Sequence, residues 1–122
     1  MQKKYYNKLI RDRVPKNITA VGSSYQIKKL SGAAFEKALK NKLIEEAQEA
    51  AGSSSKEELV KELGDLLDVI EEIKRLKRIK APQIKQEQKR ALIKKGGFKK
   101  RLFLLWSSDD GYQKHQTPTR KR

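Results

Sequence analysis

The chain has 122 residues and a formal net charge of +15, which suits one domain of ordinary size with an excess of positive charge. It has no cysteine, so neither a disulfide framework nor a thiolate metal site is possible. The N-terminal stretch lacks the apolar run of a signal peptide, and the apolar run Leu102 to Trp106 is too short to span a bilayer. We therefore expect a soluble cytoplasmic protein without a membrane partner.

The acidic residues are concentrated in one part of the chain. Ten of the fifteen lie between Glu45 and Glu72, where only Lys56 and Lys61 are basic. This segment carries −8 and the remainder of the chain carries +23. The basic excess attracts polyanions and, taken alone, favours nucleic-acid binding. The acidic segment would repel a phosphate backbone unless cations intervene, so it is the more informative feature.

The first thirty residues predict little regular structure. Residues 5–18 contain a short helical pattern that Pro15 is expected to break. Residues 17–24 end in Gly-Ser-Ser and predict a loop. Residues 25–30 could form a short strand.

Two long helices are predicted next. Ser31 is a plausible N-cap for a helix that runs to about Ala51 and ends at Gly52. After a short polar connection, Ser55 and Glu58 fit a capping box, in which the carboxylate reaches back to the cap residue. The helix that follows is expected to end near residue 79. Its apolar face comprises Leu59, Leu63, Leu66, Leu67, Ile70, Ile73 and Leu76.

The C-terminal part predicts a weaker helix over residues 82–94, which Gly96-Gly97 ends. Residues 98–106 then read as a strand that could pair with the 25–30 strand. From residue 107 the chain is polar, and we expect a basic, disordered tail over 107–122. The predicted fold is therefore mainly α: a helical bundle built on an antiparallel helix hairpin, forming one domain over 1–106.

Two acidic pairs lie on the long helices. Glu46 and Glu49 are three residues apart on the first helix, and Glu62 and Asp65 are three apart on the second. In an antiparallel hairpin with a short connection, the two pairs come level, with helix axes about 8–10 Å apart. Hard divalent cations relieve the repulsion of such carboxylates, and all-oxygen ligation suits Mg²⁺ or Mn²⁺. Acidic pairs are also common on solvated helix faces, so periodicity alone leaves both interpretations open.

The spacing of these acids resembles the metal-binding signature of the all-α nucleotide pyrophosphohydrolases, which include MazG-type enzymes and the phosphoribosyl-ATP pyrophosphohydrolases. The resemblance extends over about residues 5–105. Four segments carry it in order: Asn7 to Pro15, Lys42 to Glu49, Glu57 to Ile70 and Lys94 to Phe98.

The resemblance implies hydrolysis of a nucleoside triphosphate between its α and β phosphates, giving a monophosphate and pyrophosphate, in house-cleaning of the nucleotide pool. It implies Mg²⁺, with Mn²⁺ as an alternative, and a homo-oligomer such as a dimer or tetramer. By position, the metal ligands are Glu46, Glu49, Glu62 and Asp65. Glu45 is the candidate for orienting or deprotonating the attacking water. Candidate phosphate contacts are Arg11, Arg13, Lys94 and Lys95.

The charge leaves a second function open. A non-catalytic basic helical module that binds nucleic acid would account for the +23 outside the acidic segment. Only the pyrophosphohydrolase accounts for the paired carboxylates.

Overall fold

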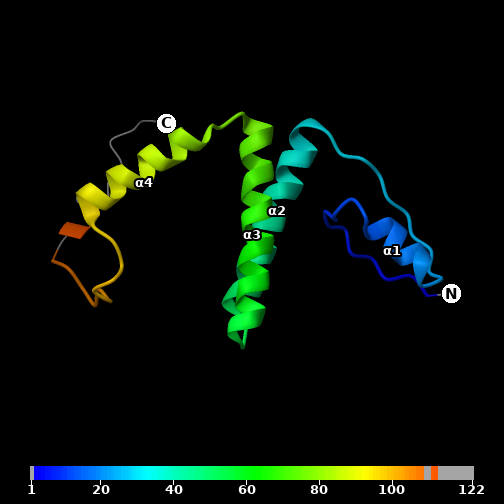
Figure 1. The fold of residues 1–122 in the computed structure, drawn as a ribbon, viewed down its shortest axis with the longest axis horizontal. Helices are drawn as coiled ribbons and strands as arrows, with labels where there is room; N and C mark the ends of the chain where they lie inside the picture. Colours follow the sequence, from blue (N-terminus) through cyan, green and yellow to red (C-terminus); the bar gives the residue numbers. More distant parts are fainter. Residues whose placement is uncertain (1, 109–110, 113–122) are drawn as a thin grey trace. The chain divides into compact units, whose positions relative to one another are not determined.

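The computed structural model describes residues 2–108 and 111–112, and within them it contains four helices and no strand (Figure 1). The helices are α1 (Val14–Ala20), α2 (Gly32–Ala51), α3 (Lys56–Lys77) and α4 (Ala81–Lys95). The chain divides into two units, Met1–Gln83 and Ile84–Arg122, so the boundary falls inside α4. The prediction of a mainly α fold is confirmed.

The hairpin of α2 and α3 is the packed part of the fold, and these two alone among the described helices pack against each other (Figure 1). Residues 52–55 connect them. The Ser55 hydroxyl accepts a hydrogen bond from the Glu58 backbone N–H at 3.1 Å, which fixes the start of α3. The Glu58 carboxylate accepts a bond from the Ser54 N–H at 2.6 Å, one residue before the expected partner. The predicted hairpin and its capping at Ser55 are thus present.

Four buried residues lie between the two helices. Leu39 on α2 and Val69 on α3 form an apolar layer, 2% and 8% exposed. Glu46 follows Leu39 by seven residues, and Glu62 precedes Val69 by seven. Since seven residues are about two helical turns, the two glutamates form the next buried layer of the antiparallel pair. The hairpin therefore buries a carboxylate pair beside its small apolar core.

Pro15 starts a helix, contrary to the prediction that it breaks one. It lies in the first turn of α1, where the missing N–H would have no helical partner in any case. The helix ends at Ala20, and the Gly22 N–H then donates to the Thr19 carbonyl at 2.9 Å. Gly22 has a φ of +83°, which a glycine adopts without strain.

The two predicted strands are wrong: residues 25–30 and 98–106 form no strand in the described part of the chain. In the second segment the Arg101 N–H donates to the Phe98 carbonyl at 3.0 Å, and Arg101 has a φ of +60°. This turn interrupts the extended run. A two-stranded ribbon is also marginal without further packing, and every side chain of residues 98–106 is exposed.

The C-terminal unit contains most of α4, which ends where predicted. Gly96 has a φ of +82°, and its N–H donates to the Leu92 carbonyl at 2.9 Å. The predicted disordered tail, 107–122, lies largely outside the described residues. None of the helices in the described residues combines the length and apolar character that a membrane crossing requires.

One side of α3 leaves apolar side chains in water. Leu59, Leu63 and Leu67, spaced four residues apart, are 37%, 43% and 59% exposed. They belong to the apolar face that the sequence predicted for this helix. Exposed apolar stripes of this kind are typical of a partner or oligomer interface.

Candidate metal centre

Three of the four predicted metal ligands come together at the buried carboxylate layer. Glu46 and Glu49 extend from α2 and Glu62 extends from α3, and each offers an oxygen within 4.8 Å of the others. Glu46 and Glu62 are buried, whereas Glu49 is exposed. The cluster therefore has two carboxylates inside the hairpin and one at its solvent side.

Two buried oxygen atoms of this cluster lack a hydrogen-bond partner: Glu46 Oε1 and Glu62 Oε1. A buried carboxylate oxygen that is neither paired nor hydrogen-bonded is strongly unfavourable. A cation supplies the missing interaction, and hard divalent ions prefer ligands of this kind. The residues therefore fit a metal ion, on an observation that does not depend on sequence spacing.

The pKa of Glu62 reflects its burial and its repulsion by the neighbouring carboxylates. Burial raises the pKa of the Glu62 carboxyl above its ordinary value, and the hydrogen bond and charge of Glu49 raise it further. The Lys61 ammonium, 3.9 Å from the Glu62 carboxylate, opposes this shift. Without a metal, the Glu62 carboxyl therefore holds its proton more readily than an ordinary glutamate does.

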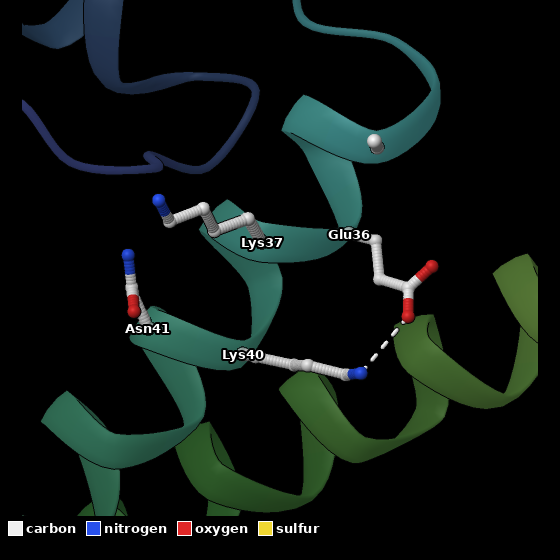
Figure 2. A pocket seen from close by; sticks show the side chains of 5 residues that line it. Glu36, Lys37, Lys40 and Asn41 are labelled. Carbon is white, nitrogen blue, oxygen red and sulfur yellow. Dashed lines mark ion pairs between the residues drawn. The ribbon is translucent and has the colours of Figure 1, made fainter.

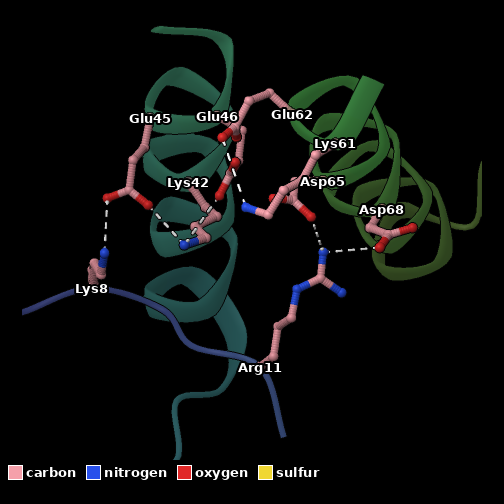
Figure 3. Close-up of polar contacts among 9 residues, drawn as sticks. All are labelled: Lys8, Arg11, Lys42, Glu45, Glu46, Lys61, Glu62, Asp65 and Asp68. Carbon is pink, nitrogen blue, oxygen red and sulfur yellow. Dashed lines mark hydrogen bonds and ion pairs between the residues drawn. The ribbon is translucent and has the colours of Figure 1, made fainter. Parts of the chain in front are cut away.

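Lys42 lies beside the cluster on α2, and the sequence reasoning did not single it out. Its ammonium is 2.7 Å from the Glu45 carboxylate and 3.3 Å from that of Glu46 (Figure 3). Burial lowers the pKa of Lys42, but hydrogen bonds to both glutamates outweigh burial and raise it. The spacings of three and four residues are helical neighbours, so the sequence did carry the signal for these pairs.

Asp65, the fourth predicted ligand, is paired with a cation. Nη2 of Arg11 lies 2.9 Å from Asp65 Oδ1 and 2.9 Å from Asp68 Oδ2 (Figure 3). The hydrogen bond from Arg11 to Asp68 is the main cause that raises the pKa of the guanidinium. Asp68 was not among the predicted site residues.

Glu45, the candidate base, is adjacent to the cluster and pairs with two lysines. Besides Lys42 at 2.7 Å, the Lys8 ammonium lies 3.9 Å from its carboxylate (Figure 3). The hydrogen bond from Lys42 lowers the pKa of Glu45, so this carboxylate is ionised near neutral pH. An ionised, half-buried carboxylate is able to accept a proton or orient a water molecule.

The remaining predicted phosphate contacts are carried by elements other than α2 and α3. Arg13 occupies the N-cap position of α1 and is exposed. Lys94 and Lys95 occupy the last turn of α4, in the second unit.

A solvent-open hollow of about 410 Å³ lies elsewhere along α2 (Figure 2). Its lining residues are Ala33, Glu36, Lys37, Lys40 and Asn41. None of the predicted site residues lines it. The Lys40 ammonium lies 2.9 Å from the Glu36 carboxylate, so these two charges in the lining of the hollow neutralise each other.

Comparisons of the chain with protein-family models, curated proteins and solved structures gave no match.

Proposed function

We propose that this chain is a Mg²⁺-dependent nucleoside triphosphate pyrophosphohydrolase of the all-α type, which cleaves between the α and β phosphates. A role in house-cleaning of the nucleotide pool accords with that reaction. The observation that carries the proposal is the pair of buried, unpartnered oxygens of Glu46 and Glu62 inside a three-carboxylate cluster. A purely solvated acidic face would not bury these atoms.

Glu46, Glu49 and Glu62 would hold the metal, and Asp65 is the candidate fourth ligand. A bound Mg²⁺ or Mn²⁺ would neutralise the triphosphate and lower the pKa of a water molecule. Glu49 is the exposed member of the cluster, so a nucleotide would approach the metal from this side.

The surrounding side chains suit the remaining tasks. Glu45 would orient the attacking water and accept its proton, because its lowered pKa keeps it ionised. Lys42 holds that carboxylate at 2.7 Å. Arg11 supplies a guanidinium for phosphate at the edge of the same cluster. Positioning and electrostatics account for most of the rate in phosphoryl transfer, so these are the tasks that matter.

The test is pyrophosphate release from a panel of ribo- and deoxyribonucleoside triphosphates, with Mg²⁺, with Mn²⁺ and with chelator. We expect metal-dependent release of pyrophosphate and monophosphate, and its loss in Glu49→Gln and in Asp65→Asn. Glu57→Gln is the matched control, because Glu57 is an exposed acid in the first turn of α3. Full activity in both ligand variants would place the metal site elsewhere, and no release from any nucleotide would reject the proposed reaction.

A second candidate function is nucleic-acid binding, favoured by the charge of +23 outside the acidic segment. Phosphate contacts make such binding fall steeply with salt. A fluorescence anisotropy titration with single- and double-stranded oligonucleotides at low salt tests it. Absence of binding there would exclude this function and leave the pyrophosphohydrolase unaffected.

A further inference from the structure

The segment that precedes α1 brings two cations to the acidic cluster of the hairpin. Lys8 lies 3.9 Å from the Glu45 carboxylate. Arg11 reaches Asp65 and Asp68, each at 2.9 Å and both through the same guanidinium nitrogen (Figure 3). These contacts link residues more than thirty positions apart, so they are not by-products of helical spacing.

The charges around the cluster explain why cations are drawn there. Six carboxylates contribute: Glu45, Glu46, Glu49, Glu62, Asp65 and Asp68. Four cations pair with them: Lys8, Arg11, Lys42 and Lys61. With all six carboxyl groups ionised, two negative charges are left, which one divalent cation would neutralise. The positions of Lys42 and Lys61 are fixed on the helices, whereas Arg11 sits on a non-helical segment.

We propose that Arg11 is the counter-cation of the metal-free site, and that a divalent metal ion competes with it for Asp65 and releases it to the triphosphate. The inference rests on the proposed function, because it requires the metal to bind at this cluster. A divalent cation bound at Asp65 would repel the Arg11 guanidinium and would replace it as the partner of the Asp65 carboxylate. The freed guanidinium then finds its preferred alternative partner, a phosphate, at the same edge of the site.

The exposure of Arg11 makes this exchange feasible. Its side chain is 59% exposed, and that of Asp68 is 62% exposed. Exposed ion pairs are weak because solvent screens them, so the guanidinium is able to leave without unfolding the hairpin. Glu46 and Glu62 stay buried between the helices throughout, which separates the fixed ligands from the exchangeable contact.

The first measurement is a Mn²⁺ titration of the full chain, in which free Mn²⁺ is quantified by its electron paramagnetic resonance signal. We compare wild type with Arg11→Gln and with Lys16→Gln, which removes one exposed cation five residues away. We expect Arg11→Gln to bind Mn²⁺ about 3- to 10-fold more tightly than Lys16→Gln, because it lacks the cation that competes with the metal for Asp65. Equal or weaker Mn²⁺ binding in Arg11→Gln overturns the inference.

The second measurement is binding of inorganic triphosphate at saturating Mn²⁺. Arg11→Gln should bind triphosphate more weakly than Lys16→Gln, so the two effects have opposite signs. A merely structural role of Arg11 would weaken both, and unchanged triphosphate binding also overturns the inference. If wild type itself binds no Mn²⁺, the proposed metal centre and this inference both fail. Equal, tight Mn²⁺ binding in both variants rejects the inference alone.

Discussion

Glu46 and Glu62 lie in the same buried layer of the α2·α3 hairpin, 5% and 9% exposed, and each has a carboxylate oxygen without a hydrogen-bond partner. Two turns away, the corresponding positions of the hairpin hold the buried apolar residues Leu39 and Val69. A buried carboxylate oxygen without a hydrogen-bond partner is destabilising, so these two oxygens oppose folding in the absence of a cation that binds them. The hairpin therefore offers a cation two buried oxygen atoms that lack another partner.

Divalent metal should therefore stabilise the protein. At a Mg²⁺ concentration one hundred times its dissociation constant, linkage adds about 2.7 kcal/mol to the free energy of unfolding. The measurement is thermal unfolding by circular dichroism, with Mg²⁺ and with chelator. Glu46→Gln should abolish most of the shift, whereas Glu57→Gln should retain it. Equal melting temperatures with metal and with chelator in wild type would contradict the prediction.

The metal-free protein should lose stability as the pH rises. Because the pKa of Glu62 is raised in the folded state, folding favours its protonated form. This contribution is fully present below the ordinary value of 4.5 and is lost as the pH rises through the raised pKa. Thermal unfolding in chelator, from pH 4 to pH 7, should show a decline that is absent in Glu62→Gln. A decline of the same size in both proteins would assign it to other groups.

Glu36 should give the opposite pH dependence. Hydrogen bonds from Lys40 and Lys77 lower the pKa of its carboxyl, and the bond from Lys77, at 3.1 Å, joins α3 to α2. The stabilisation is therefore present above 4.5 and is lost as the pH falls through the lowered pKa. Glu36→Gln should lower the melting temperature at pH 7 by a small amount, since the pair is solvent-screened, and the difference should shrink as the pH falls from 7 to 2. A matched Glu87→Gln change, within α4, should leave the melting temperature unchanged at both pH values.

The hairpin and most of its site could be predicted from local sequence signals. The Ser55 cap, Gly52 and the apolar spacing define two helices with a four-residue connection, and this brings acids at equal distances from the turn to the same level. This register was sufficient to predict that Glu46, Glu49 and Glu62 lie close together. The apolar periodicity was a poorer guide to burial, because Leu59, Leu63 and Leu67 follow the helical period and are nevertheless exposed in a single chain.

The contacts of the segment before α1 could not be predicted in the same way. Arg11 and Asp65 are 54 residues apart, and a side chain on a non-helical segment carries no periodic signal of its partner. The two strand predictions were wrong for a related reason. A β-type composition does not ensure that a partner strand lies alongside, and the positive φ at Arg101, which forms the turn, is not evident from the sequence. Local patterns specify elements, whereas long-range pairing depends on the folded geometry.

The small core should depend heavily on Leu39, which is 2% exposed. Leu39→Ala removes most of a buried side chain and leaves a cavity between α2 and α3. We expect a loss of about 2–5 kcal/mol in the free energy of unfolding, measured by urea denaturation with circular dichroism. If this variant does not fold, Leu39→Met, which conserves volume, should fold and lose less than about 1.5 kcal/mol. A loss below 1 kcal/mol for Leu39→Ala would contradict the assignment of the core.

The exposed stripe of α3 should bury itself against a second copy of the chain, as the proposed homo-oligomer requires. The stripe comprises Leu59, Leu63 and Leu67, and a charge placed within it would have to be desolvated on association. Leu67→Lys should therefore shift the sedimentation coefficient from that of an oligomer to that of a 14.1 kDa monomer. Val21→Lys adds the same charge at an apolar position that is 79% exposed, and should leave the oligomer intact. A monomeric wild type at high micromolar concentration would contradict self-association through this stripe.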